Sequence, residues 1–282
     1  MEEQKEPEKY FERFDAFSRF LHILVITSFI SLAITGMIIK FSDTGIFQFL
    51  SNLLGGYKVT GSIHRFAAFI TFVYFFLHIG YLVRKSKNRK KSFTSFFKGD
   101  NSLIPNMTDL RELIATTKWF FSKGPRPAYG RWTYWEKFDY WAVFWGVAVI
   151  GGSGLILWFP EFFTMLGLPG WFINVATIIH SDEALLAAGF IFTYHFFNTH
   201  FRPDKFPIDT VIFTGKVSME ELKHDRPREY ETIMASPELQ KKIGAPPSQA
   251  LVHAARIFGF TALTLGIILI LLIIYSMIFL YQ

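Results

Sequence analysis

The sequence predicts an all-α integral membrane protein, a four-helix transmembrane bundle followed by a fifth, C-terminal transmembrane helix. Of its 282 residues, 51% are hydrophobic and 34 are Phe, and the mean hydropathy is positive. Stretches without Asp, Glu, Lys or Arg approach or reach the length of about 17–25 residues that a spanning helix needs. Five such stretches occur: Phe20–Ile39, Phe66–Val83, Tyr140–Pro160, Ala184–Phe201 and Ile257–Tyr281.

The stretches also divide the chain into segments. The fourth span is expected to begin near Trp171, because Phe162–Ser181 is uncharged as well. The two long polar loops are too short for a substantial catalytic domain, and Thr108–Ser122 within the first is expected to form an amphipathic helix on the membrane surface. The predicted parts are a tail (1–15), the bundle (16–201, with loop 84–137), a polar segment (202–255) and the added helix (256–282).

The distribution of basic residues predicts the orientation in the membrane. Arg84–Lys137 holds 13 Lys and Arg, and Arg202–Arg256 holds nine. By contrast, Phe41–Ile63 contains only Lys58, and Glu161–Glu183 contains none. The positive-inside rule therefore puts the N-terminus and both long loops in the cytoplasm and the C-terminus outside, in a cytoplasmic (inner) membrane. The net charge of +6 reflects this bias and contact with anionic lipid, not nucleic-acid binding.

Four histidines occur as two spaced pairs inside the second and fourth spans. His64 and His78 are 14 residues apart, and His180 and His195 are 15 apart. At about 1.5 Å and 100° per residue, each pair is separated by about 21–23 Å on nearly one helix face. Both helices run from outside to inside, so the imidazoles are expected to meet at two depths. Imidazole is an axial haem ligand, and the spacing therefore predicts two bis-histidine b-type haems, outer and inner.

Other residues near these pairs are candidates for the same sites. His22, at the start of the first span, lies at the inner depth, so either His22 or His78 is expected to face His195. Arg19 and Arg65 are candidate propionate partners, because a guanidinium pairs with a carboxylate in a bidentate manner. Snorkelling to water is their alternative role. Gly189 lies between the two ligand levels of the fourth span and leaves room for a porphyrin.

His200 is not expected to belong to the two histidine pairs. It follows His180 by 20 residues, which puts it about 30 Å further along and on the opposite face of an α-helix. His200 therefore has three possible roles. It is a side chain at the membrane interface, a proton carrier at a quinone site or a ligand of a third haem.

The residues around the histidines resemble those of a known family. Arg19-Phe20-Leu21-His22 and the later histidines, with Gly130–Lys137, Gly215–Ser218 and Pro227–Tyr230, are similar to the cytochrome b (gamma) subunit of membrane-bound formate dehydrogenases and to nickel–iron hydrogenase cytochrome b. The resemblance covers about residues 13–235 and leaves out the fifth helix. It implies an outer haem on His64 and His180 and an inner haem on His22 and His195, with His78 as an additional histidine.

The same resemblance implies the function. The chain is expected to carry electrons between a partner redox subunit, on either side of the membrane, and menaquinone or ubiquinone, as part of a multi-subunit oxidoreductase and not as a stand-alone enzyme. The residues carried over to quinone contact are Thr133, Trp135, Glu136 and Lys137. A haem-free proton-relay transporter and a haem-containing anchor without quinone activity are the alternatives. With no cysteine, the chain has no covalent haem motif and no iron–sulfur ligands of its own.

Overall fold

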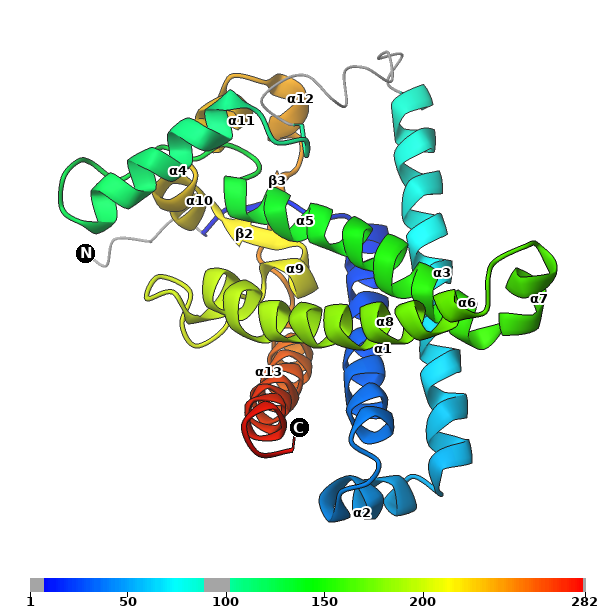
Figure 1. Cartoon of the computed structure of the whole chain (residues 1–282). Helices are drawn as coiled ribbons and strands as arrows, with labels where there is room; N and C mark the ends of the chain where they lie inside the picture. Colours follow the sequence, from blue (N-terminus) through cyan, green and yellow to red (C-terminus); the bar gives the residue numbers. More distant parts are fainter. Residues whose placement is uncertain (1–7, 89–101, 281–282) are drawn as a thin grey trace, which may run out of the picture. The chain divides into compact units, whose positions relative to one another are not determined.

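The computed structural model describes residues 8–88 and 102–280, and Arg89, Lys90 and Lys91 of the basic loop and Tyr281 of the fifth stretch lie outside them. Five helical segments among these residues are long and apolar enough to cross a membrane. They confirm the predicted fold class, and the fourth begins at Trp171 as expected (Figure 1). The five are Ala16–Lys40, Tyr57–Lys85, Tyr134–Trp158, Trp171–Phe201 and Gln249–Phe279.

The spans correspond to elements that are partly interrupted. The first, second and fifth are α1 (Ala16–Lys40), α3 (Tyr57–Asn88) and α13 (Gln249–Phe279). The third consists of α5 (Tyr134–Gly146), a π-helical turn η2 (Val147–Gly151) and α6 (Gly152–Trp158). The fourth consists of α8 (Trp171–Phe190) and two π-helical turns, η3 (Ile191–His195) and η4 (Phe197–Phe201). Two short helices, α2 (Gly45–Leu53) and α7 (Pro160–Met165), connect spans.

The chain divides into two compact units, and four of the five boundaries between them fall within helices. The first unit comprises Met1–Phe20, Gly80–Tyr140 and Asp209–Ile257. The second comprises Leu21–Ile79, Trp141–Ile208 and Phe258–Gln282, and it holds the central portions of the spans.

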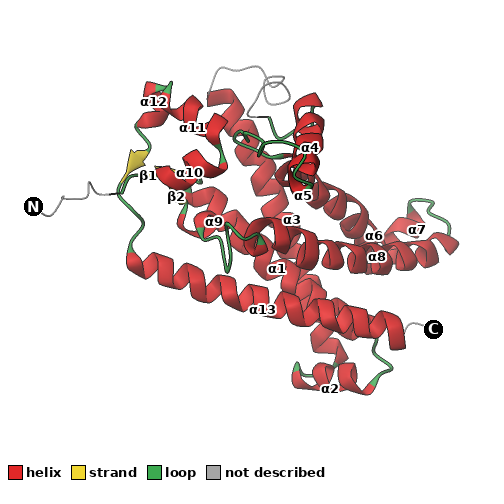
Figure 2. Ribbon diagram, turned by 90° about the vertical axis from the view of Figure 1, so that its left-hand side faces the viewer, coloured by secondary structure: helices red, strands yellow, loops and turns green. Residues whose placement is uncertain are grey.

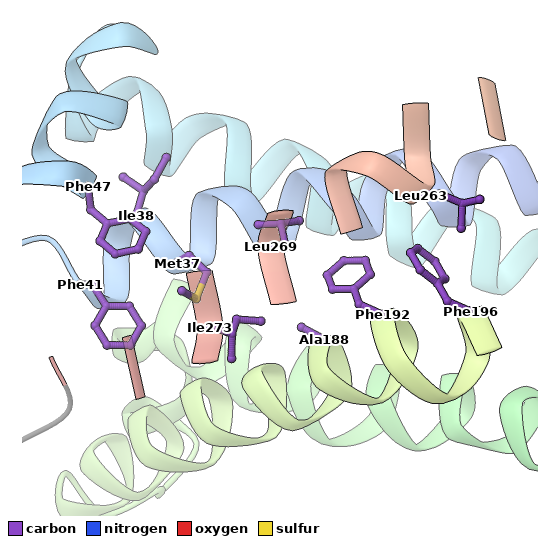
Figure 3. Close-up of a cluster of buried hydrophobic side chains, with 10 residues drawn as sticks. All are labelled: Met37, Ile38, Phe41, Phe47, Ala188, Phe192, Phe196, Leu263, Leu269 and Ile273. Atoms are coloured by element: carbon purple, nitrogen blue, oxygen red, sulfur yellow. The ribbon is translucent and has the colours of Figure 1, made fainter. Parts of the chain in front are cut away.

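In the second unit, α1 and α8 pack antiparallel to one another. Near one end, Lys40 Nζ donates to Ser181 Oγ at 3.0 Å. Eleven residues earlier on α1, the Phe29 ring lies 5.7 Å from the Phe192 ring. Buried side chains of α1, α8 and α13 form one apolar cluster, with Phe41 and Phe47 at one end (Figure 3).

The remaining two spans close the bundle. Phe75 of α3 lies 5.1 Å from Phe144 of α5, measured between ring centroids. The fifth helix packs closely on the fourth span, since a Cβ built at Gly266 would lie 2.5 Å from a Phe196 ring carbon. One side of α13 therefore belongs to the core, whereas residues such as Ile268 and Leu271 remain exposed and suit a lipid environment.

The first unit contains a small sheet that the sequence analysis does not anticipate. Strands β1 (Tyr10–Glu12), β2 (Lys216–Ser218) and β3 (Ile243–Gly244) pair antiparallel in the order β2-β1-β3. Figure 2 draws β1 as a yellow arrow. The tail and the polar segment are thus parts of one folded unit, whose apolar core includes Phe11, Val217 and Leu222. Its helices are α4 (Met107–Phe120), α9 (Val211–Thr214), α10 (Met219–Asp225), α11 (Pro227–Met234) and α12 (Pro237–Gln240).

Candidate haem sites

His64 of α3 and His180 of α8 meet inside the second unit. Their ring centroids are 6.1 Å apart, and the ring planes are inclined by 76°. A metal–imidazole bond is about 2.0–2.1 Å, and the ring centre lies about 1.1 Å beyond the nitrogen, so two imidazoles on opposite sides of one metal ion have centroids about 6.3 Å apart. The spacing of the predicted outer pair therefore fits one haem iron between the rings.

The partners of the two Nδ1 atoms fix the tautomer of each ring. Thr35 Oγ1 lies 2.6 Å from Ser31 O and 2.9 Å from His64 Nδ1. Since the hydroxyl has one proton, which it donates to the carbonyl, it accepts from the imidazole. His180 Nδ1 lies 2.9 Å from Ile150 O, and a carbonyl can only accept. Both rings therefore carry the proton on Nδ1 and leave the Nε2 lone pair for a metal, as oriented ligands do.

A glycine lies beside each of these rings, but only one of the two is needed to make room for its ring. A Cβ at Gly154 of α6 would lie 2.9 Å from His180 Cε1, which is closer than carbon atoms approach. A Cβ at Gly36 of α1 would lie 3.6 Å from His64 Cε1, an ordinary contact. Nothing in the described residues lies within 4 Å of a Cβ built at Gly189, so this position is open, and its part in holding a porphyrin stays a prediction.

A second group of histidines gathers where α1 passes the end of the fourth span. His22 of α1 lies within electrostatic range of both His195 and His200. His78 of α3 contacts Phe144 at a ring-centroid distance of 6.3 Å. The structure thus brings together His22 and His195, the inner pair that the resemblance implies, and adds His200, which is 8% exposed.

The placement of His200 corrects the expectation that it lies on the helix face opposite the histidine pairs. The Phe196 N–H bonds to Ile191 O, and the Arg202 N–H bonds to Phe197 O at 3.1 Å. These are i→i+5 bonds of π-helical turns, in which residues five apart become neighbours. His195 and His200 are five residues apart, whereas the expectation assumed α-helical geometry throughout.

The two candidate propionate partners have protein contacts. Arg19 Nη1 donates to Phe213 O and Thr214 O, at 3.1 Å each, and these two residues are the last of α9. The Arg65 guanidinium lies 5.9 Å from the centroid of the Trp158 ring. Propionate binding stays a prediction for both residues.

The four residues carried over to quinone contact lie in the first unit and are engaged inside it. Thr133 and Glu136 form a capping box at the start of α5, with both Thr133 N and Oγ1 donating to Glu136 Oε2 at 2.9 Å. Lys137 Nζ lies 2.7 Å from Asp109 Oδ1 and is buried. Trp135 is buried as well, with its ring 4.9 Å from the Tyr129 ring.

Glu136 is also part of a buried ion-pair network, whose members are Arg13, Arg131, Arg226, Glu136 and Glu229. Arg226 grips Glu136 with two nitrogens, at 2.9 and 3.0 Å. Burial lowers the pKa of Arg13 to about 10, and the positive charge of Arg226 acts in the same direction. Burial also opposes the charge of Arg226, but the two glutamates outweigh it and raise the pKa of Arg226. The network joins the tail, the start of α5 and α11.

Sequence reasoning missed the groups that orient the ligands. Ile150 acts through a backbone carbonyl and Thr35 through a hydroxyl in the middle of a helix, so neither has a sequence signature. A signal did exist for Arg226, because it directly precedes the Pro227–Tyr230 segment on which the resemblance rests.

The fold and the histidine geometry define a multi-pass α-helical membrane protein with a bundle suited to b-type haem. Residues 3–99 match the family model described as prokaryotic cytochrome b561. This match covers about a third of the chain and contains His22, His64 and His78. It confirms the resemblance to the hydrogenase and formate dehydrogenase type of cytochrome b, and it implies a b-type haem and electron transfer. No curated protein matches the chain.

Proposed function

We propose that this chain is the cytochrome b subunit of a larger complex and carries electrons across the cytoplasmic membrane between a partner redox protein and the quinone pool. The observation that carries the proposal is the His64–His180 pair, at 6.1 Å with both Nδ1 atoms bonded to the protein. Haem supplies a reversible one-electron couple when bound. His22 and His195 are assigned to a second haem.

The protein's own residues would hold each site in the geometry that electron transfer needs. The bonds from Nδ1 to Thr35 and to Ile150 O fix the imidazole planes and raise the basicity of Nε2. His180 and His195 are 15 residues apart on one span, so the two sites lie at different depths in the membrane. This separation divides the path across a hydrocarbon core of about 30 Å.

We assign the quinone and the partner from the resemblance to the hydrogenase and formate dehydrogenase type of cytochrome b. Without a cysteine it holds no iron–sulfur cluster, so electrons reach or leave the haems through a partner subunit or a diffusing quinone. We assign menaquinone or ubiquinone to the side of His22 and His195, which the distribution of basic residues assigns to the cytoplasm.

Haem stoichiometry tests the proposal most directly. The detergent-purified protein should contain two b haems per chain by the pyridine-haemochrome assay, and the His180→Ala and His195→Ala variants should each contain one. His253→Ala, at an exposed histidine of α13, is the matched control and should retain both. A wild-type protein without haem overturns the proposal and favours the proton-relay transporter.

Two further measurements test the quinone and the orientation. Quinol added to membranes should reduce the haems, whereas an anchor would bind haem without quinol-dependent reduction. Because the chain has no cysteine, Lys58→Cys and Lys223→Cys each introduce a unique label at an exposed position. In intact cells, a membrane-impermeant maleimide should label the protein with the cysteine at residue 58 and not the one with the cysteine at residue 223. Labelling at residue 223 only would show that the proposed orientation is wrong.

A further inference from the structure

Helix α4 presents an apolar face to the outside and its acidic residues to the inside. Both carboxylates of the helix, Asp109 and Glu112, are buried. On the opposite side of the helix, Met107 is 65% exposed and Ile114 is 48% exposed. A helix on the surface of a water-soluble unit has the reverse arrangement, with apolar residues toward the core.

Polar contacts fix this orientation of α4. Asp109 pairs with Lys137 at 2.7 Å, and Glu112 pairs with Arg228. One turn further, Thr116 Oγ1 lies 2.7 Å from Tyr129 Oη. The helix cannot roll to bury its apolar face without breaking two ion pairs, one of them fully buried.

The outward face combines an apolar stripe with positive charge. The exposed apolar residues of this face, at the helix and its C-cap, are Met107, Leu110, Ile114 and Phe121, which lie within about 60° of one another around the helix axis. Arg111 and Lys118 are exposed and lie about 40° and 20° from Met107 around the helix axis, so they border the stripe along one edge. Since both acids of α4 point inward, its exposed charges are positive only.

One contact ties α4 to the point where a span begins. Lys137, the partner of Asp109, is the fourth residue of α5, and the third membrane span starts at Tyr134. Asp109 and Lys137 both belong to the first unit. The face opposite that ion pair is therefore held beside the entry of a spanning helix into the membrane.

We propose that α4 is an interfacial helix that binds the surface of an anionic lipid bilayer, with its apolar stripe in the headgroup region and with Arg111 and Lys118 on the lipid phosphates. Interfacial helices have this combination of a bulky apolar face and basic edges, and they lie in the plane of the membrane. Anionic lipid attracts basic segments next to a span. This inference needs only the membrane spans and is independent of haem and quinone.

Spin labels on the full-length protein in nanodiscs test the proposal. Leu110→Cys and Ile114→Cys each provide a unique exposed cysteine in a chain without others. Each nitroxide should have a several-fold higher ratio of oxygen to Ni-EDDA collision rates than a label at Glu220→Cys, which is the aqueous control. Equal ratios at all three positions would overturn the proposal, and so would a ratio that rises only when another polypeptide copurifies.

Lipid composition tests the role of charge. Replacing Arg111 and Lys118 together by glutamate should lower the ratio at residue 114 in nanodiscs with phosphatidylglycerol. In phosphatidylcholine alone, the same double change should have a much smaller effect. An unchanged ratio in both lipids would refute the assignment of these two residues to lipid phosphates. Retention of the wild-type melting temperature shows that the first unit is still folded.

Discussion

Replacing Gly154 by alanine should selectively empty the His64–His180 haem site. The added Cβ would lie 2.9 Å from His180 Cε1 and 3.2 Å from Nδ1. Carbon atoms pack favourably at about 3.5–4.0 Å, so the ring must retreat by about half an ångström or more. The ring is not free to do so, because Nδ1 is bonded to Ile150 O at 2.9 Å.

The expected magnitude follows from those two contacts. Forcing an extra methyl group into a packed site costs about 1–3 kcal/mol. Displacing the ring also loses the Nδ1 hydrogen bond, which is worth about 1 kcal/mol. The sum of about 2–4 kcal/mol corresponds to about 30- to 700-fold weaker retention of haem at this site, since 1.4 kcal/mol is a factor of ten.

The assay is the pyridine-haemochrome stoichiometry together with reduced-minus-oxidised spectra of the purified variant. Gly36→Ala is the matched control, because its Cβ would stand 3.6 Å from His64 Cε1 and requires no movement. We expect about one haem per chain for Gly154→Ala and two for Gly36→Ala. If Gly154→Ala keeps both haems with an unaltered spectrum, the ligand geometry assigned to His180 is wrong.

Three other variants test the remaining assignments. Glu136→Gln removes the carboxylate gripped by Arg226 and should lower the free energy of unfolding by about 3 kcal/mol, visible as a lower melting temperature in detergent. Burial tends to raise the pKa of Asp15, but hydrogen bonds, chiefly from Tyr81, outweigh it and lower the pKa. Their stabilisation is therefore present above about pH 4 and lost below it, so Tyr81→Phe should destabilise the protein at pH 7 and much less at pH 3. His200→Ala should alter the electron paramagnetic resonance signal of the inner haem only.

Each of these variants has a control and a contradicting result. Glu231→Gln changes an exposed carboxylate of α11 and should leave the melting temperature unchanged. An equal effect of Tyr81→Phe at both pH values would mean that its contact with Asp15 is not electrostatic. For His200, His253→Ala is the matched change, and an unchanged signal in His200→Ala would show that the imidazole at 200 does not influence the inner haem.

The distribution of charged residues predicted the correct number of membrane spans but not the first residue of every span. The search for charge-free stretches begins the third span at Tyr140, whereas the helix begins at Tyr134. Glu136 and Lys137 occupy the first turns of that helix, and each is neutralised by a partner distant in sequence. A charge with a buried partner is tolerated in the first turns of a helix, so a simple count of charges begins this span too late.

The histidine pairs could be read from spacing because regular helices keep a constant angle per residue. This condition holds between His64 and His78, which lie on the unbroken α3, and fails after Phe190, where π-helical turns replace the α-helix. The position of His200 was therefore predicted wrongly. The strands were missed for a different reason, since segments of two or three residues are too short to display alternation.

Apart from the histidines, the resemblance rests on three segments, Gly130–Lys137, Gly215–Ser218 and Pro227–Tyr230, and residues of these segments stabilise the fold of this chain. Gly215 ends α9 with a φ of 81°, and a Cβ there would lie 2.5 Å from Phe14 O, so only glycine fits. Arg131 and Glu229, from the two other segments, pair at 2.7 Å. Such residues carry the resemblance through their part in the fold, and they give no evidence on quinone binding.

A structural role of Glu136 can be distinguished experimentally from direct contact with quinone. A quinone carbonyl needs a donor and a quinol hydroxyl needs an acceptor, but both oxygens of Glu136 already receive bonds from Arg226 and Thr133. A purely structural role lowers the melting temperature of Glu136→Gln and leaves the KM for quinol unchanged in the fraction that folds. Direct quinone contact would raise KM several-fold at the same stability. Because the bidentate Arg226 pair uses the oxygens that such contact would need, we expect the first result.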